Sequence, residues 1–453
     1  MEKAVLVAGS GISGIGAVKL LRQVGKQAVL YDGNENLDRD KIREQAGDSS
    51  LEIILGELTE ETAKRFECCV ISPGIPLEVP FVGVLRKCGV PIWSEVELAY
   101  RHAQGTLAAI TGTNGKTTTT ALLGSIVQNW VGKERGFVVG NIGIPYTQMA
   151  CQMKDDSVTV AEISSFQLES IVDFHPNVTA ILNITPDHLD RHHTMECYEQ
   201  VKESITKNQT SREWCVLNYE DERLRRFGEH AGVNVLYFSS QRKLDEGMYM
   251  DGDAIFLSLD GETYEICRTE ECHLVGQCNY ENIMAAVGMA VCLGVPMEII
   301  RRTVKAFRAV EHRIEFVEEI HGVRYYNDSK GTNPDAAIQG IRAMNRPTIL
   351  IGGGYDKGAE YDEWIAAFGT KVKKLILLGQ TAEKIAACAR KHGFFQLTFA
   401  DSLDEAVALA AQEAEAGDAV LLSPACASWG MFKNYEERGR IFKELVRKMK
   451  NPA

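Results

Sequence analysis

The residues with the clearest chemical potential lie in segment 107–118, which reads Leu-Ala-Ala-Ile-Thr-Gly-Thr-Asn-Gly-Lys-Thr-Thr. An apolar run leads into a loop with two glycines, and a helical pattern follows. Such a loop binds phosphate: backbone N–H groups and the helix N-terminus surround the anion, Lys116 reaches the outer phosphates, and the Thr117 hydroxyl is a Mg²⁺ ligand. The usual pattern has another glycine five residues before Gly115, where Ile110 stands. We predict a mononucleotide-binding loop, with an incidental glycine turn as the alternative.

Further polar groups stand where predicted strands end. Glu162 closes a strand over 157–162, and the strand predicted over 178–184 leads to Asp187 and His188. In α/β enzymes the site lies at the carboxyl ends of the strands, and an acid there holds Mg²⁺. These groups favour a functional site over isolated structural roles. Lys202, by contrast, would on its own be interpreted as a solvated helix lysine.

The chain begins with a second glycine loop. An apolar run over 4–8 precedes Gly-Ser-Gly-Ile-Ser-Gly at 9–14, and another apolar run over 28–31 ends in Asp32. This order predicts a Rossmann-like unit, with a phosphate at the glycine loop and Asp32 at a ribose or base edge. NAD, a nucleoside-diphosphate sugar and a purely structural turn remain as alternatives. A strand ending in the proline-glycine turn 72–76 could meet the same ligand.

The remaining chain shows two further patterns. Short alternating runs with Asp-Gly turns over 251–268 indicate small antiparallel hairpins. An apolar helix then carries Asn279 and Asn282, which share one face and could read a base. Beyond it, strands alternate with helices to the C-terminus and polar residues follow the strand ends, which predicts a third, mostly parallel α/β unit.

Length and composition set the broad class. The 453 residues are enough for two to four domains, and the net charge of -13 argues against a general nucleic-acid binder. The 12 cysteines are scattered, so neither a disulfide framework nor a zinc motif is expected. The N-terminus lacks the pattern of a signal peptide, and no apolar run approaches the ~18 residues of a membrane span. We expect a cytoplasmic protein without a membrane association.

One phosphate loop and two further ligand-binding units suggest a ligase. Activation of a carboxylate as an acyl phosphate, followed by attack of an amine, needs a phosphate cradle, Mg²⁺ and two pockets that align the partners. An NAD-dependent oxidoreductase would leave the Gly-Lys-Thr loop unexplained. A nucleotide switch without chemistry would leave the second set of metal-type ligands unexplained.

Several motifs resemble the Mur ligases of peptidoglycan synthesis, and the resemblance covers the whole chain. They are Gly-Thr-Asn-Gly-Lys-Thr at 112–117, Glu-Ile-Ser-Ser-Phe-Gln-Leu at 162–168, Asn-Ile-Thr-Pro-Asp-His-Leu-Asp-Arg at 183–191 and Asn-Asp-Ser-Lys at 327–330. The first unit and the tail at 423–435 are most similar to the branch that adds D-glutamate to UDP-N-acetylmuramoyl-L-alanine. Another Mur-type ligase or a folylpolyglutamate synthase, with a different acceptor, is the alternative.

The resemblance implies an α/β fold of three consecutive domains. Residues 1–96 would be a Rossmann-like domain for the UDP-sugar, 97–309 a central ATPase domain with the phosphate loop, and 310–453 a Rossmann-like domain for the amino acid. The implied cofactors are ATP and two Mg²⁺ ions, and the implied partners are the UDP-sugar substrate and D-glutamate. A monomer is expected.

The resemblance also implies roles for individual residues. The implied ATP contacts are Gly112, Thr113, Asn114, Gly115, Lys116, Thr117, Thr118, Asn279, Asn282, Arg313 and Asp328. The implied metal ligands are Thr117, Glu162, His188 and Lys202 as a carbamate, and the implied catalytic residues are Lys116, His188 and Lys202. The implied substrate contacts are Ser13, Asp32, Ser72, Gly74, Asn141, Ser164, His188, Lys330, Thr332, Lys357, Ser428 and Tyr435.

Three positions depart from the family pattern. Gly33 and Asn34 follow Asp32, where the family often has threonine and arginine over the uracil and diphosphate. Tyr435 stands where a phenylalanine is often found. The base packing is therefore the least specified part of the expectation.

Overall fold

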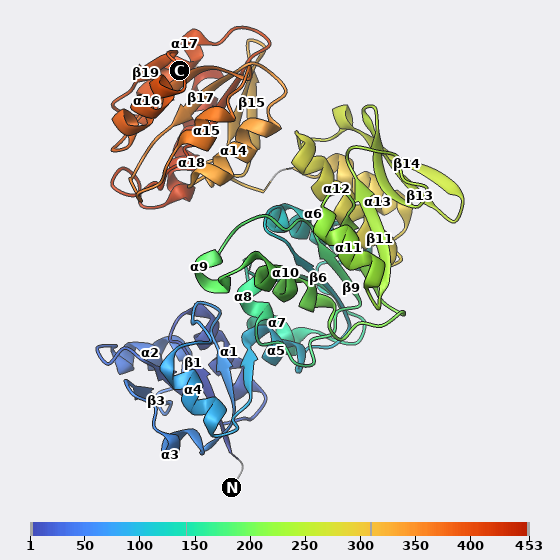
Figure 1. Cartoon of the computed structure of the whole chain (residues 1–453), viewed down its shortest axis with the longest axis vertical. Helices are drawn as coiled ribbons and strands as arrows, with labels where there is room; N and C mark the ends of the chain where they lie inside the picture. The colour runs from blue at the N-terminus through green and yellow to red at the C-terminus, as the bar shows by residue number, and fades with distance from the viewer. Residues whose placement is uncertain (1–2, 142, 309, 451–453) are drawn as a thin grey trace. The chain divides into compact units, whose positions relative to one another are not determined.

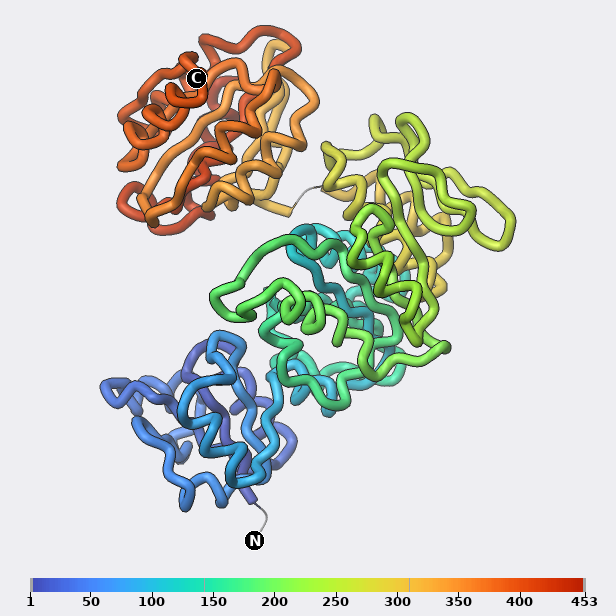
Figure 2. Tube along the Cα trace, viewed as in Figure 1, coloured from blue at the N-terminus to red at the C-terminus, as the bar shows by residue number. Residues whose placement is uncertain are grey.

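The computed structural model describes residues 3–141, 143–308 and 310–450 (Figure 1). The chain divides into two compact units: Met1–Ile266 together with Asn282–Val304, and Cys267–Glu281 together with Lys305–Ala453. Three β-sheets follow one another along the chain, whose course from the N- to the C-terminus is coloured in Figure 2. The helices among the described residues are too short or too polar to cross a bilayer.

The first sheet is a parallel five-stranded sheet of order β3-β2-β1-β4-β5. Its strands are β1 (Ala4–Ala8), β2 (Ala28–Asp32), β3 (Glu52–Leu55), β4 (Phe66–Ile71) and β5 (Ile92–Ser94). Its helices are α1 (Ile12–Gln23), α2 (Arg39–Ala46), α3 (Glu60–Ala63), α4 (Pro80–Lys87) and α5 (Glu95–Tyr100). The predicted Rossmann-like unit is thus confirmed.

Alternate residues of β1 enter two different cores, because successive side chains of a strand point to opposite faces. Val5 and Val7 pack with α1, α2 and α5, whereas Leu6 packs with α3 and α4 on the other face. A sheet covered on both faces needs apolar residues at consecutive positions, which explains the unbroken apolar run at 4–8.

The second sheet has nine strands in the order β14-β13-β12-β11-β10-β9-β6-β8-β7. Its strands are β6 (Thr106–Thr111), β7 (Gly136–Gly140), β8 (Val158–Glu162), β9 (Val178–Ile181), β10 (Trp214–Asn218), β11 (Asn234–Ser239), β12 (Gly247–Asp251), β13 (Ala254–Leu259) and β14 (Glu262–Arg268). Strands β6–β12 pair in parallel, and β12 pairs antiparallel with β13 as the hairpin pattern predicts.

The helices along this part of the chain include the one that follows the phosphate loop. They are α6 (Lys116–Val131), α7 (Tyr146–Met149), α8 (Ser165–Leu168), α9 (Leu189–His192), α10 (Met195–Glu203), α11 (Glu222–His230), α12 (Gln277–Cys292) and α13 (Met297–Ala306). Short 3₁₀ turns lie at Ala150–Gln152, Ser204–Thr206 and Thr269–Glu271. The α6 helix confirms the predicted helix after the phosphate loop.

The third sheet, in the second unit, has the order β15-β16-β20-β17-β18-β19, with β15 antiparallel at one edge. Its strands are β15 (Glu315–Ile320), β16 (Val323–Asn327), β17 (Thr348–Gly352), β18 (Val372–Leu377), β19 (Leu397–Phe399) and β20 (Ala419–Leu422). One face packs on α14 (Pro334–Ala343), α15 (Asp362–Ala366) and α16 (Ala382–Lys391), and the other on α17 (Leu403–Glu413) and α18 (Tyr435–Lys450). The predicted, mostly parallel third unit is confirmed.

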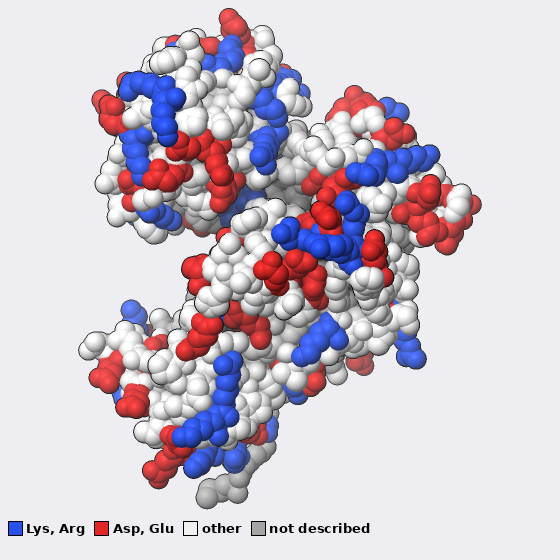
Figure 3. All heavy atoms as spheres, in the orientation of Figure 1, with Lys and Arg blue, Asp and Glu red and all other residues white. Residues whose placement is uncertain are grey.

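Charges of both signs are interspersed on the face drawn in Figure 3. Acidic side chains gather over the β13 and β14 hairpin, where Asp260 and Glu262 are exposed. This distribution matches the acidic net charge of the chain.

Candidate functional site

The phosphate loop joins β6 to α6, and its backbone geometry requires glycine. Gly112 has φ 148° and Gly115 has φ 86°, a region that other residues rarely adopt. A Cβ at Gly115 would lie 2.2 Å from Asn282 Oδ1. Ile110, where the usual pattern has a glycine, is a fully buried residue of β6, so this loop begins later in the chain than that pattern places it.

Two lysines converge on the carbonyl of Gly112. Lys116 Nζ donates to Gly112 O at 2.8 Å and to Thr113 O at 2.9 Å, and Lys202 Nζ donates to Gly112 O at 2.8 Å. Lys202 has a relative exposure of 1%, and its amine lies 4.6 Å from the centroid of the Tyr198 ring. Burial, and then the positive charge of Lys116, hold the pKa of Lys202 well below its usual value. The prediction of a solvated Lys202 from its own sequence context is therefore wrong, because α10 turns this face inward.

The carboxylate of Glu162 is placed as a cation ligand would be. Glu162 ends β8 opposite Ile110 of β6, directly before the phosphate loop. It is buried, and Oε1 accepts from Asn141 Nδ2 at 2.9 Å. Oε2 is buried without a hydrogen-bond partner among the described residues. A buried, unpaired carboxylate oxygen is costly unless a cation or a donor completes it, so this residue fits a Mg²⁺ site.

Residues after β9 hold the phosphate loop in shape. Asn183 Oδ1 accepts from Asn114 N at 2.8 Å, and its Nδ2 donates to Asn114 O at 3.2 Å. Thr113 Oγ1 lies 3.2 Å from Tyr198 Oη and accepts from Thr185 N at 3.0 Å. The predicted strand over 178–184 therefore ends at Ile181, because the chain leaves the sheet to bind the loop.

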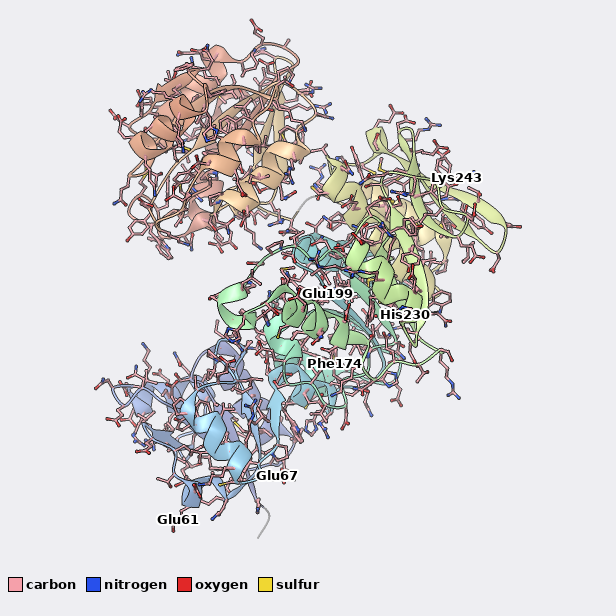
Figure 4. All side chains as sticks on the ribbon, viewed as in Figure 1. Glu61, Glu67, Phe174, Glu199, His230 and Lys243 are labelled. Atoms are coloured by element: carbon pink, nitrogen blue, oxygen red, sulfur yellow. The ribbon has the colours of Figure 1, made fainter. Side chains whose placement is uncertain are left out.

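Asp187 and His188 lie in the segment between β9 and α9. His188 adopts φ 52°, and its ring is 3.4 Å from Asp187 Oδ2 and 4.8 Å, between centroids, from the ring of Phe166. Both side chains are about half exposed and so accessible to a ligand. Glu199, labelled in Figure 4 on α10, instead pairs with Arg223 at 3.1 Å.

The two asparagines of α12 have different neighbours. Asn282 Oδ1 accepts from Thr119 Oγ1 at 3.3 Å, so this residue belongs to the phosphate-loop region. Asn279 Nδ2 donates to Val275 O at 2.8 Å, and Asn279 falls in the second compact unit. Both side chains are buried.

The first glycine loop requires glycine because its backbone packs closely against neighbouring atoms of the protein. A Cβ at Gly14 would lie 1.9 Å from Gly9 O, and one at Gly9 would lie 2.6 Å from Ser72 Oγ. That Ser72 oxygen is buried and has no hydrogen-bond partner within the described part of the chain. Asp32 accepts from Ser10 N at 3.1 Å and from Ser10 Oγ at 2.7 Å, whereas sequence analysis singled out Ser13. Ser13 is half-buried near the start of α1.

Arg191, which sequence analysis did not assign to the site, joins the region after β9 to the turn beside Ser72. Its guanidinium donates to Pro73 O and Ile75 O, each at 3.0 Å, and Nε donates to Glu169 Oε1 at 3.1 Å. The cation also lies 4.4 Å from the Phe166 ring centroid. Arg191 lies in a polar motif, and nothing in the neighbouring sequence predicts this bridging contact.

Other predicted residues of this unit lie around these loops. Ser164 is the N-cap of α8, and its hydroxyl donates to Gln167 Oε1 at 2.9 Å. Gly74 is exposed in the turn after β4, and Thr118 is buried in the first turn of α6. Asn141 is exposed apart from its bond to Glu162.

A second residue that sequence analysis did not assign is Glu95, which supports Ser164 through Gln167. Gln167 Nε2 donates to Glu95 Oε1 at 2.8 Å, while Oε2 is buried without a partner among the described residues. Burial raises the pKa of Glu95 to about 7 from its ordinary 4.5. The folded protein therefore binds more protons than the unfolded chain between these pH values, and its stability falls as pH rises through this window.

We expect Glu95→Gln to remove this loss. The variant should gain stability relative to the parent between pH 5 and pH 8, by at most about 3 kcal/mol, the free energy of the pKa shift. Melting temperatures of both proteins at the two pH values measure this difference. Glu61→Gln, at an exposed position, is the control. If the stability difference between Glu95→Gln and the parent were the same at pH 5 and at pH 8, the raised pKa of Glu95 would be contradicted.

In the second unit, Asp328 follows β16 and is buried. Its Oδ2 accepts from Ser423 Oγ at 2.7 Å, and its Oδ1 accepts from Ile314 N at 3.3 Å. Burial raises the pKa of Asp328 to about 6, and the positive charge of Arg313 is the first effect that opposes the rise. Arg313 and Asp328, both predicted ATP contacts, are thus brought together here.

The predicted substrate contacts of this unit lie on segments after β16, β17 and β20. Lys357 is exposed, with its amine 4.6 Å from the ring centroid of Trp429. Ser428 is buried, and Tyr435 begins α18, with its ring 6.1 Å from that of His312. Lys330 and Thr332 are half-buried in the segment between β16 and α14.

The matches to known families cover each part of the chain. Residues 3–94 match the "Mur ligase MurD-like, N-terminal domain", residues 110–290 the "Mur ligase middle domain", and residues 312–426 the "Mur ligase, glutamate ligase domain". The three ranges together account for most of the chain.

Relatives and solved structures agree with these matches. UDP-N-acetylmuramoylalanine–D-glutamate ligases from Lachnospira eligens and Lachnoclostridium phytofermentans are 55% and 53% identical, over 98% and 100% of this chain and 98% and 99% of theirs. MurC from Thermotoga maritima has a TM-score of 0.59 at 16% identity, covering 99% of this chain and 100% of that one. MurF from the same organism, solved with ADP, has a TM-score of 0.58 at 18% identity, covering 99% and 96%. The chain therefore belongs to the Mur ligase family, among the relatives named UDP-N-acetylmuramoylalanine–D-glutamate ligases.

Proposed function

We propose that this protein is an ATP-dependent ligase that joins D-glutamate to UDP-N-acetylmuramoyl-L-alanine in peptidoglycan precursor synthesis, with release of ADP and phosphate. The observation that carries the proposal is the 55% identity, across nearly the whole chain, to a ligase named for this reaction. The phosphate loop, the Glu162 oxygen that has no partner among the described residues, and the buried Ser72 oxygen beside the first glycine loop support this proposal.

The reaction proceeds in two steps. A carboxylate oxygen of the alanyl residue attacks the γ-phosphorus of ATP, and ADP leaves. The amine nitrogen of D-glutamate then attacks the acyl carbon of the resulting acyl phosphate. Inorganic phosphate leaves, and the nitrogen gives its extra proton to solvent. Both steps depend on alignment of the partners and on stabilisation of phosphoryl charge.

The phosphate loop would supply the first stabilisation. Backbone N–H groups at the start of α6 face the loop, and the helix dipole adds positive potential there. Lys116 now donates to two loop carbonyls, and we propose that its amine turns to the β- and γ-phosphates of ATP. Asn183 and Tyr198 would keep the loop rigid, so that little reorganisation accompanies the reaction.

Thr117 and Glu162 would hold one Mg²⁺, which neutralises the phosphate charge when bound. His188 would hold a second ion together with a carbamate on Lys202. The carbamate would form by addition of the neutral Lys202 amine to CO₂ with release of one proton to solvent, and the depressed pKa of the buried Lys202 favours the neutral amine. The carbamate would place an anion beside the cationic Lys116, a favourable charge pair that the neutral amine does not offer.

We further propose one ligand for each sequence range. Residues 1–96 would bind the UDP-sugar, 97–309 ATP and 310–453 D-glutamate. The other implied ATP and substrate contacts keep their roles within this proposal, with Lys357 paired to a carboxylate of D-glutamate. Arg191 would position the turn at Ser72 and Gly74 for the UDP-sugar.

Trapping of the acyl phosphate tests the order of the two steps. With ATP and UDP-N-acetylmuramoyl-L-alanine but without D-glutamate, hydroxylamine should intercept the intermediate as a hydroxamate of the alanyl group. The hydroxamate should require ATP. Its absence, in a preparation that makes the final product when D-glutamate is added, would contradict the acyl-phosphate step.

A further inference from the structure

Three side chains of different chemistry meet in the second unit, on helices that the proposed reaction does not use. Asp362 begins α15, Cys388 lies in the last turns of α16, and His392 is the C-cap of α16. One ligand atom from each lies within 4.8 Å of the other two. None of the three is among the residues proposed to bind ATP, the UDP-sugar or D-glutamate.

The backbone places these donors on one side of the helix pair. Cys388 and His392 are four residues apart, and His392 N donates to Cys388 O at 3.1 Å, so their side chains lie on one helix face. His392 Nε2 lies 2.8 Å from Asp362 Oδ1, which closes the set across the two helices. Trp364, two residues after Asp362, is fully buried in the core and anchors α15.

We propose that Asp362, Cys388 and His392 form a binding site for a transition-metal ion of the Zn²⁺ class. A thiolate, an imidazole and a carboxylate are the ligands that Zn²⁺ takes in a tetrahedral site. A soft thiolate discriminates against Mg²⁺, which takes oxygen ligands, so this site is chemically distinct from the one proposed at Glu162. Three protein ligands leave the fourth position to water.

Lys391 competes with the metal for the same carboxylate. Its Nζ lies 2.8 Å from Asp362 Oδ1, but its side chain is 72% exposed. An exposed ion pair of this kind contributes little stability, so a divalent ion can displace the amine at small cost. The Cys388 thiol must lose its proton on binding, and His392 must be neutral, so affinity should rise with pH.

The bound ion would fasten α15 to α16 beside the segment that carries Lys357. Lys384 of α16 donates to Ala359 O at 2.8 Å, and Thr381, which precedes α16, accepts from Gly354 N at 3.0 Å. Both contacts hold the segment between β17 and α15. A metal ion bound to both helices would therefore stabilise the segment that carries Lys357, the proposed D-glutamate contact.

Cobalt titration of the full-length, chelator-treated protein tests the site, because Co²⁺ bound to a thiolate shows a charge-transfer absorption that oxygen ligands do not give. We expect one equivalent of Co²⁺ to produce this band and Zn²⁺ to abolish it. Cys388→Ser should remove the band. His392→Gln should weaken metal binding by at least about 10- to 100-fold, because loss of a residue that only hydrogen-bonds to a metal ligand already has an effect of this size. Lys391→Ala should tighten binding, because it removes the competitor.

Two controls identify the thiol. Cys151→Ser changes an exposed cysteine elsewhere and should leave the titration unchanged. Cys267 and Cys272 lie 3.4 Å apart between their sulfur atoms and form another possible thiolate locus, so Cys272→Ser should also leave it unchanged. Absence of the band in the parent protein, or a band that survives Cys388→Ser and disappears with Cys272→Ser, would overturn the proposal. Loss of ligase activity would not affect this spectroscopic readout, so the two proposals fail separately.

Discussion

Replacement of Lys116 by alanine should lower ATP-dependent phosphate release at least about 100-fold, the loss typical when one preorganised donor to developing charge is removed. Lys116 begins α6, and its amine already lies on the phosphate loop through the carbonyls of Gly112 and Thr113. Without it, the charge on the transferring phosphoryl group would lose its nearest side-chain cation. Steady-state phosphate release with saturating substrates is the measurement.

Lys133→Ala is the matched control, because Lys133 is an exposed lysine just beyond the end of the same helix. It should retain the parent rate. The melting temperature of Lys116→Ala should stay near that of the parent, which separates a catalytic loss from unfolding. Turnover at the parent rate in a folded Lys116→Ala protein would refute the assignment of the loop.

Replacement of Lys202 by alanine should remove most activity, and short-chain carboxylates should restore part of it. The side chain is almost fully buried, so its truncation leaves a space beside Gly112 O. A small carboxylate in that space would stand in for the carbamate and supply the anion to the metal. Phosphate release as a function of added acetate measures the rescue.

The Lys202→Arg variant distinguishes a role of the carbamate from a role of a positive charge at this position. Arginine stays charged, cannot form the carbamate and fills the space, so this variant should be inactive and should not respond to acetate. Full activity of Lys202→Ala, or equal activity of Lys202→Arg and the parent, would remove the carbamate from the mechanism.

Much of the fold followed from local patterns. Continuous apolar runs such as Ala4–Ala8 predict buried parallel strands, and the helical pattern after the glycine loop predicts α6. The strand over 178–184 was predicted too long, since its apolar residues continue past Ile181 while Asn183 turns to the phosphate loop. A run of apolar residues predicts that the side chains are buried, but it does not distinguish a strand of a sheet from a loop that packs against the sheet.

The site residues were harder to predict where their environment depends on residues that are distant in the sequence. A motif predicts a role for Lys116, and the end of a strand predicts one for Glu162. Lys202 has an ordinary helical context, and its burial arises from Tyr198 and the phosphate loop. Arg191 and Glu95 act through carbonyls and amides far away in the sequence, which no local pattern records.

The central claim is the identity of the reaction, and its most direct test is an acceptor screen. Phosphate release would be measured with ATP and UDP-N-acetylmuramoyl-L-alanine in the presence of individual L- and D-amino acids. We predict release with D-glutamate alone, together with equimolar ADP and the amide product. Release with a different amino acid would contradict the assigned acceptor and the proposed role of Lys357, and no release with any acceptor would contradict the ligase itself.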